Sequence, residues 1–182
     1  MKFIQLLSLM LILLINGCTH PPSVKSQPNP ATRSSFAISG AIAAKTPRKA
    51  WTATFYWAQR GADDYQILIY GPAGSAAAEV TAHNGTVTYR EGKKILRARQ
   101  AEELLAKETG VRLPISYLYY WIKGLPAPGA VTSIKRNKDK DLTQLKQAGY
   151  TLEYSDYRNH YPYNIRLTGH QLMVKIVIQS WQ

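Results

Sequence analysis

The chain has 182 residues, and its 23 Lys and Arg against 11 Asp and Glu give a formal net charge of +12. A single cysteine excludes an intramolecular disulfide, so the fold must be held by packing. The positive excess indicates an anionic partner such as phospholipid headgroups or an acidic protein. Nucleic acid is not expected, because no basic–aromatic binding module is visible and the chain begins like an exported protein.

The first 17 residues have the pattern of an export signal. Lys2 precedes a largely apolar run, Phe3 to Ile15, which is shorter than the roughly 20 residues that a helix needs to cross a bilayer. An apolar Ile15 and a small Gly17 then stand before Cys18, as in bacterial lipoprotein signals. That resemblance implies cleavage before Cys18 and acylation of this residue, with an ordinary secretory signal as the alternative.

A polar, proline-rich segment follows the cysteine. Residues 18–34 contain four prolines and no hydrophobic periodicity, so they are predicted to be an extended, flexible tether. Thr19 stands where an aspartate would signal retention in the inner membrane, which favours anchoring in the outer membrane. A single domain is expected over residues 35–182.

Alternating apolar and polar residues dominate this domain. Residues 51–57 place Trp51, Phe55 and Trp57 on one face, and residues 150–155 and 171–181 alternate in the same way. Glycine-containing turns separate the segments, which favours an antiparallel meander or barrel of about eleven short strands. The other predicted strands are 36–43, 64–70, 76–82, 86–90, 94–98, 130–136, 142–147 and 164–168.

Two consecutive segments have helical spacing instead. Residues 101–110 end at a glycine, and a second helix is predicted from Pro114 to Gly124. The second helix has Leu118, Trp121 and Ile122 on one face. Both helices are expected to cover one face or one mouth of the sheet.

The sequence offers no arrangement for catalysis. Its histidines (20, 83, 160 and 170) lie in the tether or in predicted turns, without metal-ligand spacing to other ligating residues. Asp63 and Asp64 are adjacent, which suits a turn better than a general acid–base pair. We therefore expect neither an enzyme nor a metal or other cofactor.

Aromatic residues gather in two places, on the predicted strand at 51–57 and in the helix at 117–121. They could form a solid core. A curved sheet under a helical cover could equally enclose an apolar cavity wide enough for acyl chains. The aromatic positions do not distinguish these two interpretations.

Four stretches together resemble the LolB family of outer-membrane lipoproteins, which receive lipoproteins from the soluble carrier LolA. The resemblance runs from Phe36 to Gln182, and the expected acylated cysteine at the front of the chain strengthens it. The stretches are ISGAIAA (38–44), ATFYWAQRGADDYQILIYGPAGS (53–75), ARQAEELLAKETGVRLPISYLYYWIKGLP (98–126) and VKIVIQSWQ (174–182).

The resemblance implies an unclosed antiparallel β-barrel, lidded by short helices, that holds acyl chains in an apolar cavity. It implies a monomer, anchored in the outer membrane and facing the periplasm, that accepts lipoproteins from LolA and inserts them among the outer-membrane phospholipids. Candidate cavity residues are Trp51, Phe55, Trp57, Leu118, Trp121 and Ile122.

The resemblance also implies a membrane-insertion loop formed by Gly71, Pro72, Ala73 and Gly74. The family usually carries a large apolar residue where this chain has Ala73. Two alternatives remain at this stage. One is an outer-membrane lipoprotein that acts as a structural or assembly module, and the other is the soluble carrier itself, against which Cys18 argues.

Overall fold

The computed structural model describes residues 35–61, 63–71, 74, 76–109 and 114–182. The expected signal peptide, Cys18, the tether, Pro72 and Ala73 lie outside these residues.

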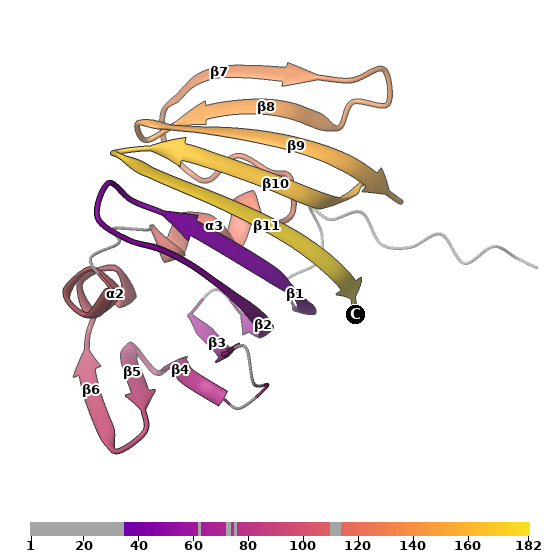
Figure 1. The fold of residues 1–182 in the computed structure, drawn as a ribbon. Helices are drawn as coiled ribbons and strands as arrows, with labels where there is room; N and C mark the ends of the chain where they lie inside the picture. Colours follow the sequence, from indigo (N-terminus) through magenta and orange to yellow (C-terminus); the bar gives the residue numbers. More distant parts are fainter. Residues whose placement is uncertain (1–34, 62, 72–73, 75, 110–113) are drawn as a thin grey trace, which may run out of the picture.

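Eleven strands form one antiparallel sheet in the order β6-β5-β4-β3-β2-β1-β11-β10-β9-β8-β7 (Figure 1). The outermost strands, β6 and β7, are not paired with each other, so the sheet is curved but not closed. The expectation of an unclosed barrel of about eleven strands is confirmed. The strands are β1 (Phe36–Lys45), β2 (Ala50–Gly61), β3 (Asp64–Tyr70), β4 (Ala76–His83), β5 (Thr86–Glu91), β6 (Lys94–Ala98), β7 (Val131–Arg136), β8 (Leu142–Gln147), β9 (Tyr150–Arg158), β10 (Tyr161–Gly169) and β11 (Leu172–Trp181).

One pairing is non-local. β1 pairs with β11 along nearly its whole length, which joins the two ends of the domain in the middle of the sheet. The register shifts between Ser39 and Gly40, where a Cβ on Gly40 would collide with the carbonyl oxygen of Val177. Glycine is therefore required for the close approach of these two strands.

Two helices lie between β6 and β7 in the chain. They are α2 (Ala101–Thr109) and α3 (Ile115–Trp121), as the sequence predicted, although α3 ends three residues before Gly124. The chain then turns through Gly124, which has a φ of 70° in the left-handed region that favours glycine. Neither α2 nor α3 has the length and apolar character needed to cross a bilayer.

The core lies between the concave face of the sheet and α3. Predicted alternation places Leu152, Val174 and Ile178 inside, all nearly inaccessible to solvent. Leu118 and Trp121 fill the space from the helix side, with 7% and 0% exposure. The helix thus covers the concave face, but it does not fill the whole of it.

Candidate functional site: an apolar cavity beneath α3

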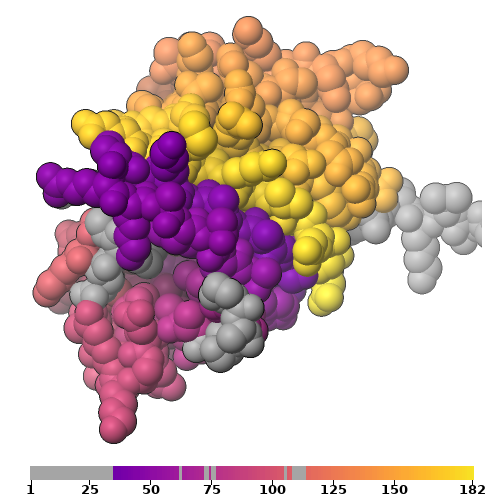
Figure 2. Space-filling view, in the orientation of Figure 1, coloured from indigo at the N-terminus to yellow at the C-terminus, as the bar shows by residue number. Residues whose placement is uncertain are grey.

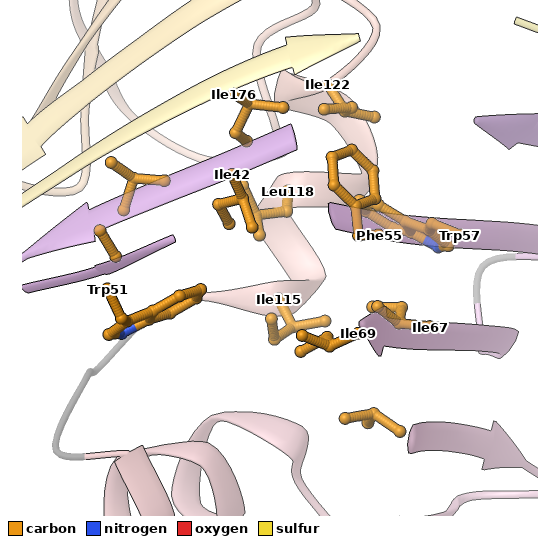
Figure 3. Close-up of a pocket in the computed structure, with 13 residues that line it drawn as sticks. Ile42, Trp51, Phe55, Trp57, Ile67, Ile69, Ile115, Leu118, Ile122 and Ile176 are labelled. Atoms are coloured by element: carbon orange, nitrogen blue, oxygen red, sulfur yellow. The ribbon is translucent and has the colours of Figure 1, made fainter. Parts of the chain in front are cut away.

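An apolar cavity remains between α3 and the sheet (Figure 3). The space that the centre of a water molecule can reach measures about 120 Å³. A single water needs only about 10–15 Å³ on this measure, so the cavity is well beyond solvent size. It is lined by Ile42, Ala44, Trp51, Phe55, Trp57, Ile67, Ile69, Val80, Ile115, Leu118, Ile122, Val174 and Ile176.

The lining follows from strand periodicity. Side chains two residues apart in a strand point to the same face, so β1, β2, β3 and β11 each contribute alternate residues to the cavity. Helix α3 and the turn after it close the opposite side with Ile115, Leu118 and Ile122, which the close-up shows facing the strand residues (Figure 3).

Five of the six candidate cavity residues line this space, namely Trp51, Phe55, Trp57, Leu118 and Ile122. Trp121 does not. Its ring packs against Tyr117 and Tyr150 at centroid distances of 5.4 and 5.7 Å, and it is completely buried. Its position on the face of α3 was predicted correctly, but the ring belongs to the solid part of the core.

A polar anchor holds Trp121. Its indole N–H donates to Oε1 of Gln147 at 2.9 Å, and the backbone N–H of Ala127 donates to the same oxygen at 3.0 Å. Nε2 of Gln147 donates to the carbonyl of Ala127 at 2.7 Å. This buried amide ties α3, the segment after it and β8 together, which fixes the position of the cavity cover.

Sequence reasoning missed most of the aliphatic lining. Ile67 and Ile69 belong to a strand that was predicted, and Ile115 precedes Leu118 by nearly one helical turn. The spacing of these residues was available as a signal. Which of them face empty space depends on how far the sheet curves, and periodicity does not report curvature.

The cavity is suited to an apolar ligand and not to catalysis. Its only polar side-chain atoms are on the two tryptophans. The indole N–H of Trp57 donates to Oε1 of Gln59, which lies outside the cavity, at 2.7 Å. Each CH₂ group moved from water into such surroundings gains about 0.8 kcal/mol. Unbranched acyl chains therefore match the cavity in chemistry.

A polar hollow adjoins the cavity on the other side of Trp57 and Ile115. Burial raises the pKa of the Tyr65 phenol in this hollow, and the nearby carboxylates of Glu102 and Asp63 raise it further. Tyr65 is therefore protonated and uncharged at neutral pH. The hollow on this side of the apolar cavity is also lined by the charged side chains of Asp63, Arg99 and Glu102.

The described histidines contact individual neighbours. His83 and His160 each approach one carboxylate, at 3.5 Å to Asp64 and 2.7 Å to Asp141. Within the described ranges, no group of three or more His, Cys, Asp and Glu side chains could hold a metal ion.

The connection between β3 and β4 contains the expected membrane-insertion loop. The backbone N–H of Gly74 donates to the carbonyl of Gly71 at 2.9 Å, and Gly74 has a φ of 74°. These two residues therefore close a tight turn. Pro72 and Ala73 lie outside the described residues, so the loop role remains a prediction.

Several solved structures have a fold similar to that of this chain. Solved structures with a similar fold include a LolA superfamily protein from Nitrosomonas europaea (TM-score 0.52, 11% identity, covering 83% of this chain and 86% of that one). Another is a putative outer membrane lipoprotein-sorting protein domain from Vibrio parahaemolyticus (TM-score 0.51, 9% identity, covering 82% and 85%). These likenesses concern the fold alone.

Two sequence relatives match this chain with higher identity than these structures do. The outer-membrane lipoprotein LolB of Cellvibrio japonicus is 32% identical over 177 residues, which cover 91% of this chain and 87% of the relative. The protein of the same name from Pseudomonas aeruginosa (strain LESB58) is 36% identical over 150 residues, covering 80% and 73%. The family profile described as "Outer membrane lipoprotein LolB" matches residues 34–181. With nearly the whole domain matched and the LolA-like sheet in place, the chain belongs to the LolB family of outer-membrane lipoproteins.

Proposed function

We propose that this protein is an outer-membrane receptor that accepts lipoproteins from the periplasmic carrier LolA and inserts them into the outer membrane. The observation that carries the proposal is the apolar cavity beneath α3, with its lining of aliphatic and aromatic side chains. A purely structural module would gain more stability from filling this space, because cavities cost packing energy.

The transfer requires no nucleotide if affinity for acyl chains rises from carrier to receptor to membrane. A gain of about 0.8 kcal/mol for each buried CH₂ means that a few additional buried groups change the distribution of cargo by orders of magnitude. Purified protein mixed with a LolA–lipoprotein complex should therefore take up the cargo. Cargo that stays with the carrier would contradict the proposal.

The second part of the proposal is the anchor at Cys18. The expected motif is Ile15, Gly17 and Cys18, and stable attachment to a membrane takes more than one acyl chain. Cys18→Ala should abolish incorporation of radiolabelled fatty acid and remove the mature protein from the outer-membrane fraction. Absence of label on the wild-type protein would contradict this part of the proposal.

The third part concerns the loop at 71–74, where Ala73 replaces the large apolar residue usual in the family. Alanine offers little apolar area to a bilayer, so Ala73→Leu should speed insertion of cargo into liposomes severalfold and leave uptake from LolA unchanged. Ala73→Glu should slow insertion alone, because a carboxylate resists transfer into an apolar phase. Both rates can be followed by flotation of cargo with liposomes. Wild-type insertion by both variants would show that the loop has no such role.

A further inference from the structure

Two turns project from one end of the sheet. Antiparallel pairing places the β1–β2 turn (46–49) and the β5–β6 turn (92–93) at the same end, because β2 pairs with β3, β3 with β4 and β4 with β5. Figure 2 shows the indigo β1–β2 turn and the pink β5–β6 turn at the left and lower margins of the molecule. We call this the loop end of the sheet.

Both turns of the loop end are basic. Lys45, Arg48 and Lys49 lie at the β1–β2 turn, and Lys93 and Lys94 at the β5–β6 turn, and all five side chains are exposed. Among the described residues, the first four make no ion pair.

Bases outnumber acids on both turns. Residues 45–49 contain three bases and no carboxylate. Residues 91–94 contain two lysines and Glu91, which accepts a hydrogen bond from the Tyr89 hydroxyl at 3.0 Å. Positive charge is therefore in excess on both turns.

The other end of the sheet is different. Arg60 pairs with Asp64 at 3.0 Å and Arg158 with Asp156 at 2.9 Å. The lysines of the β7–β8 turn alternate with aspartates in the sequence 138–141. The charges are thus balanced locally at this end, whereas bases outnumber acids at the loop end.

Apolar side chains accompany the bases of the loop end. Ile95 follows Lys94 and is 48% exposed, and Met173 is paired with Lys45 across β1 and β11 and is 44% exposed. Lysine stems beside exposed apolar side chains suit a membrane–water interface, where the charge contacts phosphate and the apolar groups lie deeper.

We propose that the loop end docks on anionic phospholipid, with the basic β1–β2 and β5–β6 turns contacting lipid phosphates. The inference rests on the proposed function, because docking would bring the cargo cavity to the bilayer. Each basic residue near an anionic surface strengthens binding about fivefold, and the attraction acts over a Debye length of about 8 Å at physiological salt.

The test uses the chain beginning at Thr19, which lacks the lipid anchor but retains every described strand and helix. Binding is measured by sedimentation with phosphatidylcholine vesicles, with and without phosphatidylglycerol. The variant Arg48→Glu/Lys49→Glu/Lys93→Glu reverses the charge of three bases at the loop end. The matched control, Lys135→Glu/Lys138→Glu/Lys140→Glu, makes the same charge change at exposed positions on β7 and the β7–β8 turn. Thermal unfolding checks that both variants are folded.

The wild type should bind the anionic vesicles more tightly than the neutral ones and should lose this preference at high salt. The loop-end variant should bind the anionic vesicles on the order of 100-fold more weakly, while the control changes less than threefold. Equal losses in both variants, or no loss in the loop-end variant, would overturn the inference.

Cargo uptake from LolA separates this inference from the proposed function. Reduced uptake with unchanged vesicle binding would mean that the basic turns recognise an acidic protein, and the inference would be wrong. If the wild type takes up no cargo but its vesicle binding depends on the turns, the proposed function fails and the docking surface stands.

Discussion

Ile42→Asp is expected to reduce cargo uptake from LolA by on the order of 100-fold. Ile42 lines the cavity from β1, so the substitution places a carboxylate among groups that cannot solvate it. The desolvation penalty is several kcal/mol, and each 1.4 kcal/mol corresponds to about tenfold in binding. Uptake is measured as cargo co-purifying with the receptor after incubation with a carrier–cargo complex.

Ala43→Asp is the matched control. Ala43 follows Ile42 in the same strand and points to the opposite face, where it is paired with Lys175 of β11. The new carboxylate would therefore lie beside a cation on the convex face, and uptake should remain within twofold of wild type. Comparable uptake by the two variants would show that acyl chains bind elsewhere.

Trp121→Ala should lower the free energy of unfolding by about 3–5 kcal/mol, as measured by urea denaturation. The tryptophan is completely buried, and its removal leaves both a large void and the Gln147 amide without one of its donors. Trp121→Phe keeps most of the ring packing and loses only the indole hydrogen bond, so its cost should be about 1–2 kcal/mol.

Variants of Trp121 and Trp51 should distinguish effects on stability from effects on cargo binding. Trp121→Phe should take up cargo normally, because this side chain lies outside the cavity. Trp51→Ala should impair uptake with a smaller loss of stability than Trp121→Ala, because Trp51 lines the cavity and is only half-buried. If uptake falls more in Trp121→Phe than in Trp51→Ala, the lining has been assigned to the wrong residues.

The fold was largely predictable because one face of each strand is buried. Residues such as Leu152, Leu167 and Val174 alternate with polar neighbours. This alternation predicted both the positions of the strands and the face of each strand that packs on the core. The helix boundaries at Pro114 and Gly124 were marked by residues with restricted or permissive backbones. Helix α3 itself ends at Trp121, and the N–H groups of Lys123 and Gly124 donate three residues back instead of four.

The cavity was less predictable. Trp57 and Trp121 look alike in the sequence, as large aromatics on apolar faces, yet one lines open space and the other fills it. The difference arises from the distance between α3 and the sheet, which depends on long-range contacts such as that between Trp121 and Gln147. A periodic pattern indicates the face to which each side chain points, but it does not report the distance between α3 and the sheet.

The position of Phe36 at the start of β1 has a mechanical consequence. β1 runs from the tethered end of the domain to the β1–β2 turn, a length of about 33 Å for its 10 residues. The chain from the proposed anchor at Cys18 to Phe36 can extend to at most about 60 Å, which exceeds that length. The tether is thus long enough for the domain to turn over while it stays attached to the membrane. Under the proposed function, one anchored molecule would turn its loop end first toward the arriving carrier and then toward the membrane, so that reorientation would replace diffusion between the two encounters.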